Sequence, residues 1–422
     1  MKRLDLFPIT TKIENNELSI ARINLKNLAD EFNTPLYIYD KATLDSSVTE
    51  YKNALASYYG THASVTYAGK AYLCTAIAQW TQLHNLTLDC TGEGEIHIAL
   101  NAKVKRENIL VHGVNKSDAD LKSAIQHAGT IVVDNLTELE RITQLFTRHS
   151  SLNLWLRLLP GVTVSTHHAH TQTGHHESKF GMAREEILQA AEFCKKNKMP
   201  LKGLLFHQGS NFRDPEPLIP DIDLALDIAK EIGFDDEWHF CPGGGWGVAY
   251  HEDELPHPSI EHYVKGICEA VIEGCEKRNL SLPHLHLEPG RSLVARAGVA
   301  IYRVGAIKKR ENKTWVLVDG GMADNPRYAM YGARYSCLAV SGVTEERSEV
   351  ISVAGPYCES GDVIFEDLPM SKLKTGDLIA VPMSGAYHLS MSSNYNGARK
   401  PAVYMLENGE AKLIQKRETL DD

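Results

Sequence analysis

Short apolar runs alternate with longer amphipathic stretches between about residue 34 and residue 290. The apolar runs, which are typical of buried β-strands, lie at 65–68, 86–89, 109–112, 131–133, 153–158, 203–206, 238–241 and 285–288. Between them, apolar residues recur at helical spacing, for example over 118–127, 136–146 and 184–196. This alternation predicts a parallel (β/α)₈ TIM barrel, with a doubly wound open sheet as the alternative.

The pattern changes after about residue 290. Helical periodicity fades, and short strands separated by Gly-rich turns are expected at 299–304, 315–318, 349–353 and 378–381. These features predict an all-β domain, either a barrel or a sandwich. We therefore expect the barrel over 34–290, and a β-domain that combines 1–33 with 291–422.

Composition narrows the class of protein. The net charge of −10 argues against a general affinity for nucleic acid or for an anionic membrane. No apolar run approaches the ~20 residues needed to span a bilayer, and residues 1–5 lack the apolar core of a signal peptide. The eight cysteines are scattered without a C-x-x-C pair, which predicts free thiols and a cytoplasmic location.

Lys70 stands at the end of the strand predicted at 65–68. A lysine there is badly placed for packing, because burying its ammonium costs several kcal/mol unless the charge is paired or lost. Such a lysine suits covalent attachment to an aldehyde. The alternative is a strand-end lysine that reaches into solvent.

Two further strands end in motifs that suit an aromatic cofactor with a phosphate. His207 can lie flat against a ring, and Ser210 can donate a hydrogen bond to phosphate. Three glycines at 243–245 would let backbone N–H groups approach an anion closely, although a tight turn would use them as well. The glycines match neither the dinucleotide-binding nor the P-loop pattern.

The last barrel strand ends in an acid and a base around a Pro-Gly turn, Glu288 and Arg291. A carboxylate here could hold a pyridine nitrogen protonated, and a local ion pair is the alternative. Three Gly-containing loops follow in the β-domain, at 319–331, 355–362 and 385–396. Each loop alone could be an ordinary turn.

Taken together and in this order, these motifs resemble the fold-type III pyridoxal 5'-phosphate (PLP) decarboxylases, most closely the diaminopimelate decarboxylases. The resemblance extends from about residue 34 to residue 405. It implies an alanine-racemase-like (β/α)₈ barrel with a C-terminal β-domain, and PLP as the cofactor. It also implies a head-to-tail homodimer whose active sites are shared between subunits.

The resemblance implies a role for each matching residue. Lys70 would bind the cofactor covalently, and Glu288 would face the pyridine nitrogen. The other cofactor-binding positions are His207, Ser210, Gly243, Gly244, Gly245, Arg291 and Tyr387. The substrate-binding positions are Arg291, Arg327, Tyr331, Glu359 and Tyr387. Cys358, from the neighbouring subunit, would return a proton to the substrate carbon.

The reaction expected from this resemblance is the decarboxylation of meso-2,6-diaminopimelate to L-lysine and CO₂, in lysine biosynthesis. Glu288 favours decarboxylation over racemisation, because the related alanine racemases carry an arginine in that role. Arg291 and Arg327 would bind the distal carboxylate, and Glu359 the distal ammonium. One alternative is a sibling decarboxylase that acts on carboxynorspermidine, an ornithine-like substrate or a carrier-bound glutamyl group. Another is a non-catalytic PLP carrier, against which Cys358 and Glu359 count.

Two positions depart from the family pattern. Tyr72 stands where asparagine is common and is expected to reshape the wall beside the cofactor ring. Tyr328 stands where proline is usual, which bears on the placement of Arg327. The histidine-rich segment 167–176 has no zinc-motif spacing and is similar to the mobile active-site loop of the family, so we expect no metal.

Overall fold

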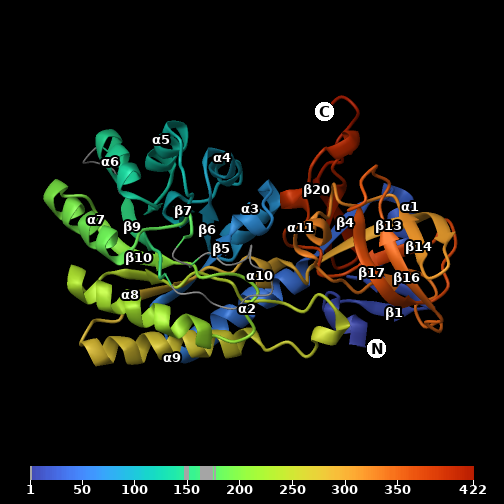
Figure 1. Cartoon of the computed structure of the whole chain (residues 1–422), viewed down its shortest axis with the longest axis horizontal. Helices are drawn as coiled ribbons and strands as arrows, with labels where there is room; N and C mark the ends of the chain where they lie inside the picture. Colours follow the sequence, from blue (N-terminus) through green and yellow to red (C-terminus); the bar gives the residue numbers. More distant parts are fainter. Residues whose placement is uncertain (1, 147–151, 162–173, 175–176) are drawn as a thin grey trace. The chain divides into compact units, whose positions relative to one another are not determined.

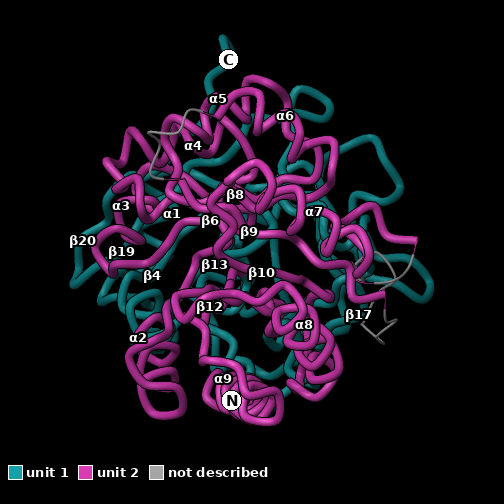
Figure 2. The backbone as a smooth tube through the Cα atoms, turned by 90° about the vertical axis from the view of Figure 1, so that its left-hand side faces the viewer, with its two compact units in different colours: residues 1–47, 248–257, 291–422 teal, residues 48–247, 258–290 magenta. Residues whose placement is uncertain are grey.

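The computed structural model describes residues 2–146, 152–161, 174 and 177–422 (Figure 1). The chain divides into two compact units, coloured separately in Figure 2. One unit, here called the β-unit, comprises Met1–Ser47, Val248–His257 and Arg291–Asp422. The other, called the barrel unit, comprises Val48–Gly247 and Pro258–Gly290.

Eight parallel strands close the barrel in the order β10-β11-β12-β5-β6-β7-β8-β9. They are β5 (Ala63–Ala68), β6 (Thr87–Cys90), β7 (Ile109–Val111), β8 (Thr130–Val133), β9 (Asn153–Leu158), β10 (Leu201–Phe206), β11 (His239–Cys241) and β12 (His284–Leu287). Every strand expected for the barrel from the sequence overlaps one of these. The predicted (β/α)₈ barrel is confirmed, and the open sheet is excluded because β12 pairs with β5.

Helices alternate with these strands along the chain. They are α2 (Lys41–Tyr58), α3 (Thr75–Leu83), α4 (Glu93–Asn101), α5 (Asp118–His127), α6 (Leu136–Leu145), α7 (Arg184–Asn197), α8 (Ile219–Ile232) and α9 (Ile260–Arg278). The start of α5 shows how local sequence fixes a boundary. Ser117 accepts a hydrogen bond from Asp120 N, while the Asp120 side chain accepts one from Ser117 N. This reciprocal cap satisfies two backbone donors that would otherwise lack partners.

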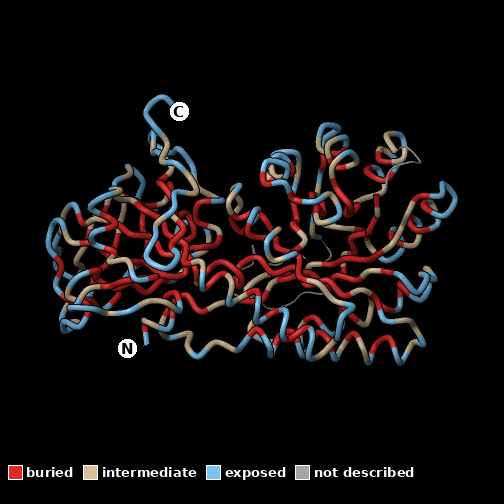
Figure 3. Tube along the Cα trace, turned by 180° about the vertical axis from the view of Figure 1, so that it is seen from behind, coloured by how far each residue is buried: buried red, intermediate tan, exposed pale blue. Residues whose placement is uncertain are grey.

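Apolar side chains fill the interior of the barrel. Leu110, Val132, Trp155, Leu205 and Cys241, from five different strands, form one buried cluster. The strands are buried along most of their length, whereas the helices alternate buried and exposed positions (Figure 3). The barrel is therefore a packed core, and its chemistry must lie at a rim.

A mixed sheet organises the β-unit, with the order β17-β16-β14-β13-β4-β19-β20. Its strands are β4 (Leu36–Asp40), β13 (Gly298–Lys309), β14 (Thr314–Val318), β16 (Glu349–Ala354), β17 (Val363–Met370), β19 (Ala402–Glu407) and β20 (Glu410–Gln415). The strand β18 (Leu378–Val381) pairs with β13 and with β15 (Leu338–Ala339). Two short helices, α10 (Arg291–Val294) and α11 (Arg327–Tyr331), begin at the predicted site residues Arg291 and Arg327.

The strand β4 lies in this mixed sheet, although the alternating pattern of the chain begins at its position. It pairs antiparallel with β13 and parallel with β19, and all five of its residues are buried. A strand buried on both faces has the same continuous apolar sequence in either kind of sheet. The pattern alone therefore does not reveal which sheet it joins.

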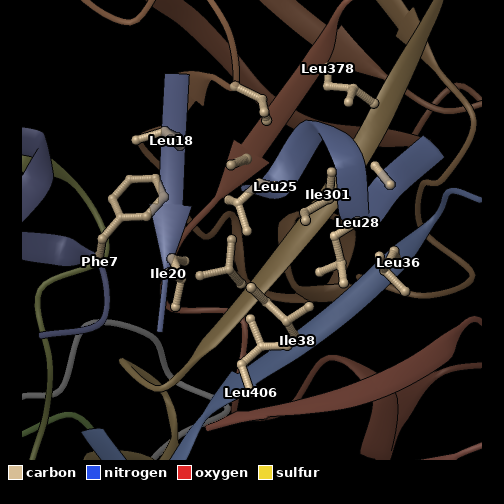
Figure 4. Packing of buried hydrophobic residues seen from close by; sticks show 14 of the residues in the cluster. Phe7, Leu18, Ile20, Leu25, Leu28, Leu36, Ile38, Ile301, Leu378 and Leu406 are labelled. Carbon is tan, nitrogen blue, oxygen red and sulfur yellow. The ribbon is translucent and has the colours of Figure 1, made fainter. Parts of the chain in front are cut away.

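The core of the β-unit joins distant parts of the chain (Figure 4). Phe7, Leu18, Leu36, Ile301 and Leu406 are all fully buried in one cluster. The small sheet β1 (Lys12–Glu14), β2 (Glu17–Ile20) and β3 (Ile23–Asn24) and the helix α1 (Leu25–Phe32) belong to this unit. Burial of these side chains holds the N-terminal segment against the C-terminal strands.

Among the described residues, no helix combines the length and the apolar character that crossing a membrane requires.

Candidate active site

Polar side chains gather at the carboxyl ends of the barrel strands, which share one face of a closed parallel barrel. Glu288 directly follows β12, and His207 directly follows β10. Lys70 is exposed and lies in the short 3-10 helix Gly69–Ala71 after β5. Two more polar residues, Asp89 and Arg157, lie in β6 and β9, and His112 directly follows β7. The barrel unit thus brings the predicted Lys70, His207 and Glu288 to one face.

Three of these side chains converge, and each has a buried polar atom without a hydrogen-bond partner among the described residues. A ligand atom of each of Asp89, His112 and Glu288 lies within 4.8 Å of the others. Within the described part of the chain, Asp89 Oδ1, His112 Nε2 and Glu288 Oε1 are buried and unpaired. Buried polar atoms in folded proteins are nearly always paired. Three unpaired atoms together therefore indicate a binding site for a polar group.

Burial and charge set the protonation of these groups. Burial raises the pKa of Glu288 to about 7, and the charges of Lys70 and Arg157 oppose that rise. The pKa of Asp89 is also raised, first by burial and then by the nearby Glu288. Burial, followed by the Arg157 charge, lowers the pKa of His112. These shifts favour neutral groups, and a cationic ligand would stabilise the ionised carboxylates.

Arg157 is held in place from two sides. Its Nη1 lies 3.5 Å from Asp134 Oδ1, an atom that also accepts a hydrogen bond from Gly181 N at 3.1 Å. Its guanidinium carbon lies 4.4 Å from the centroid of the Phe180 ring. The sequence predicts no specific role for Arg157, Asp89 or His112, although all three stand at the ends of predicted strands. In a barrel these ends share one face, where active-site residues gather.

The three glycines at 243–245 are packed too tightly for any side chain. A Cβ on Gly243 would lie 2.7 Å from Phe206 O, and one on Gly244 would lie 2.0 Å from Glu288 O. Gly243 and Gly245 also have positive φ. This geometry explains why glycine is needed and is compatible with backbone N–H groups bound to an anion.

The glycines and the histidine loop are joined. Gly244 N donates to His207 Nδ1 at 3.4 Å, and Phe212 N donates to Gly245 O at 2.9 Å. The half-buried Ser210 lies between His207 and Phe212 in the sequence. The predicted phosphate-binding positions therefore belong to two adjoining loops of the barrel unit.

Two buried arginines share one tyrosine ring in the β-unit. The guanidinium carbons of Arg291 and Arg327 lie 5.6 and 4.1 Å from the centroid of the Tyr250 ring. Arg291 also donates to Tyr250 Oη and lies 4.7 Å from the centroid of the Tyr387 ring. No motif marks Tyr250 in the sequence, and only the tertiary contact reveals it. Tyr331, at the far end of α11 from Arg327, is half-buried.

The loop between β16 and β17 carries Cys358 and Glu359, and both are exposed. Asp362 anchors this loop to its neighbour, because its carboxylate accepts a hydrogen bond from Met322 N at 2.7 Å. In addition, Cys358 N donates a hydrogen bond to Asn396 Oδ1 at 3.2 Å. The three Gly-containing loops predicted from the sequence are thus bound to one another within the β-unit.

The departures from the family pattern have defined positions. Tyr72 is buried, and its carbonyl accepts a hydrogen bond from Tyr67 Oη at 2.6 Å. Tyr328 bonds through its hydroxyl to Glu366 of β17. Tyrosine at 328 is therefore compatible with the helix that begins at Arg327. The histidines of the segment 167–176 lie outside the described residues.

Comparison with known protein sequences finds pyridoxal-dependent decarboxylases. Residues 42–295 match the family model described as "Pyridoxal-dependent decarboxylase, pyridoxal binding domain". The diaminopimelate decarboxylase of Bacillus subtilis is 38% identical over 97% of this chain and 94% of its own length. That of Synechocystis is 35% identical over 99% of this chain and 92% of its own.

Solved structures agree with the sequence relatives. The diaminopimelate decarboxylase of M. jannaschii, in co-complex with L-lysine, matches with a TM-score of 0.88 and 30% identity, over 98% of this chain and 96% of its own. The enzyme of Helicobacter pylori complexed with L-lysine gives 0.83 and 31%, over 94% of this chain and 98% of its own. The resemblance seen in the motifs is confirmed. The chain belongs to the diaminopimelate decarboxylase family of pyridoxal-dependent decarboxylases.

Proposed function

We propose that the chain catalyses the PLP-dependent decarboxylation of meso-2,6-diaminopimelate to L-lysine and CO₂. The observation that carries this proposal is the buried guanidinium of Arg327, which is 7% exposed and has no carboxylate partner among the described residues. A buried cation without a counter-ion is costly, so this group is suited to bind an anionic part of the substrate.

The barrel unit offers the groups that PLP requires. The unpaired oxygen of Glu288 would hold a proton on the pyridine nitrogen, and the amine of Lys70 would bind the aldehyde. The glycine loop with Ser210 would bind the phosphate, and His207 would cover the ring. When bound, PLP supplies an electron sink for the electron pair left by departing CO₂. Asp89, His112 and Glu288 would also suit a divalent cation, and family membership favours the cofactor.

Substrate choice depends on the β-unit. Arg291 and Arg327 would bind the distal carboxylate, and the ring of Tyr250 fixes the two guanidinium groups relative to each other. Glu359 would bind the distal ammonium, and Tyr331 and Tyr387 would contact the substrate. Breaking buried, charge-assisted contacts of this kind costs ~2–5 kcal/mol. Ornithine lacks the distal carboxylate and would be rejected.

Proton return requires a second copy of the chain in this proposal. Cys358 would deliver a proton to the substrate carbon of the neighbouring subunit, so the active unit would be a homodimer. The exposed position of Cys358 and Glu359 supports this role, because a second chain can reach them. All eight cysteines lie in the described residues and are free, which supports a cytoplasmic location.

A substrate panel tests the proposal. The PLP-loaded protein would be incubated with meso-, LL- and DD-diaminopimelate, ornithine and lysine, while CO₂ and amine products are measured. We expect equal amounts of CO₂ and L-lysine from the meso compound and none from ornithine. CO₂ release from ornithine, with none from meso-diaminopimelate, would contradict the proposal and favour a sibling decarboxylase.

A further inference from the structure

A continuous chain of hydrogen bonds leads away from Arg327 into the core of the β-unit. Arg327 Nη1 donates to Tyr335 Oη at 2.5 Å, and Tyr335 Oη lies 2.8 Å from His388 Nε2. His388 Nδ1 lies 3.3 Å from Tyr37 Oη, which in turn donates to Asp324 Oδ2 at 2.9 Å. We call these four residues beyond Arg327 the arginine relay.

Every member of the relay is buried, and the members come from separate parts of the fold. Tyr37 lies in β4, while Asp324 and Tyr335 flank the helix α11 on its two sides in the sequence. His388 follows Tyr387, whose φ of +61° is unusual for a residue with a side chain. The relay therefore forms only when the sheet that contains β4 and the loops that carry Asp324 and His388 are folded.

One donor–acceptor arrangement pairs every group of the relay, starting from the guanidinium and ending at the carboxylate. A guanidinium can only donate, so Tyr335 accepts from Arg327 and its own proton is free to bond to His388 Nε2. The proton of His388 then lies on Nδ1 and is donated to Tyr37, whose hydroxyl proton goes to Asp324. Tyr37 Oη also lies 3.0 Å from Tyr302 Oη. The lone pair of Tyr335 is thus held toward Arg327.

The protonation states agree with this direction. Burial, and then the charges of Arg327 and Arg291, lowers the pKa of His388, which keeps the ring neutral with one nitrogen free to accept. Burial raises the pKa of Asp324 to about 6, so the carboxylate is ionised at pH 7.5. Tyr302 Oη also donates to Asp324 Oδ2, at 2.6 Å. The relay therefore ends at a carboxylate oxygen that accepts hydrogen bonds from two tyrosine hydroxyls.

We propose that Tyr335 and His388 are positioning residues, which hold the guanidinium of Arg327 in the orientation that binds the distal carboxylate of the substrate. This inference depends on the proposed function. Tyr335 lies outside the motifs seen in the sequence, and His388 lies in the predicted loop at 385–396 without an assigned role. Because they act through Arg327, their loss should weaken only ligands that carry the distal carboxylate.

Two ligands separate this effect from a general structural one. L-Lysine keeps the amino-acid head that Arg327 would bind, whereas 1,5-diaminopentane has the same amines and no carboxylate. The Kd of each ligand would be measured on PLP-loaded protein by calorimetry, together with kcat and KM for meso-diaminopimelate. The variants are Tyr335→Phe, His388→Leu and His388→Gln. Tyr404→Phe serves as the control, because its half-buried ring stacks on Phe32 in the same unit.

For Tyr335→Phe and His388→Leu, we expect the Kd of L-lysine and the KM for meso-diaminopimelate to rise about tenfold. This is the effect expected from the loss of one hydrogen bond to a charged group. The Kd of 1,5-diaminopentane and kcat should change less than about twofold. His388→Gln should recover most of the affinity, because its amide can accept from Tyr335 and donate to Tyr37. Tyr404→Phe should match the wild type.

Equal weakening of both ligands, or no change in either, would overturn the inference. So would a fall in kcat at constant KM, or a Gln variant as weak as the Leu variant. Failure of the proposed function would appear differently, as a wild-type protein that neither binds L-lysine nor decarboxylates meso-diaminopimelate.

Discussion

The carboxylate of Asp221, the third residue of α8, is fully buried. In the described part of the chain, neither of its oxygens has a hydrogen-bond partner. Burial raises its pKa to about 7, whereas in the unfolded chain the group titrates near its ordinary value of about 3.9. The native state therefore binds this proton more tightly than the unfolded state. The stability contributed by this group is complete below about pH 4 and is lost as pH rises through about 7.

The variant Asp221→Asn should remove this loss. The variant should have a higher free energy of unfolding than the wild type. This difference should be about 2–3 kcal/mol larger at pH 8 than at pH 5. Denaturant unfolding at both pH values measures the difference. Asp236→Asn, at an exposed position, should change stability little at either pH. A gain that is the same at pH 5 and pH 8 would show that Asp221 does not titrate as described.

At the scale of single elements, the glycine loop after β11 is the most constrained part of the site. Gly244 has no room for a methyl group, because the carbonyl of Glu288 would lie 2.0 Å away. Gly94, in the first turn of α4, has nothing within 4 Å of such a methyl group. The two positions therefore form a matched pair for substitution by alanine.

Gly244→Ala should push the loop and Glu288 apart and weaken PLP binding at least tenfold, because both groups are expected to hold the cofactor. Gly94→Ala should leave PLP binding unchanged and stabilise the helix by about 0.5–1 kcal/mol. Equilibrium dialysis of PLP and thermal unfolding measure the two effects. Unchanged cofactor affinity in Gly244→Ala would argue against phosphate binding at this loop.

The elements differ in how well the sequence predicts them. The eight barrel strands could be predicted, because strands buried on both faces are short continuous apolar runs between amphipathic helices. The placement of β4 could not be predicted, since the same apolar run suits either sheet. Strand-end positions such as Glu288 could be predicted as candidate site residues. Tyr250 and His388 could not, because only the fold brings them to the arginines.

At the scale of the whole molecule, the predicted site residues are divided between two units. The barrel unit holds most of the residues expected to bind PLP, while the β-unit holds Arg291 and Tyr387 together with the residues expected to bind the substrate and donate the proton. Within the β-unit, for example, the guanidinium carbon of Arg291 lies 4.7 Å from the centroid of the Tyr387 ring. Catalysis in the proposed homodimer requires the residues of both units. Of these, Cys358 would come from the second copy of the chain.

Complementation tests that arrangement. Lys70→Ala and Cys358→Ala should each be nearly inactive as pure proteins. After the two are mixed under conditions that exchange subunits, about a quarter of the wild-type activity should return, because half of the dimers are hybrids and each hybrid has one intact site. Assays of activity before and after mixing measure this. No recovery, despite proven subunit exchange, would contradict shared active sites.

Lys70 is expected to bind the cofactor covalently beside Glu288. Borohydride reduction of the PLP-loaded protein fixes the cofactor to the lysine that binds it, and mass spectrometry of the digested protein identifies that residue. We predict the phosphopyridoxyl group on Lys70, and its loss in Lys70→Ala. Labelling of a different lysine, or undiminished labelling in the variant, would contradict the account.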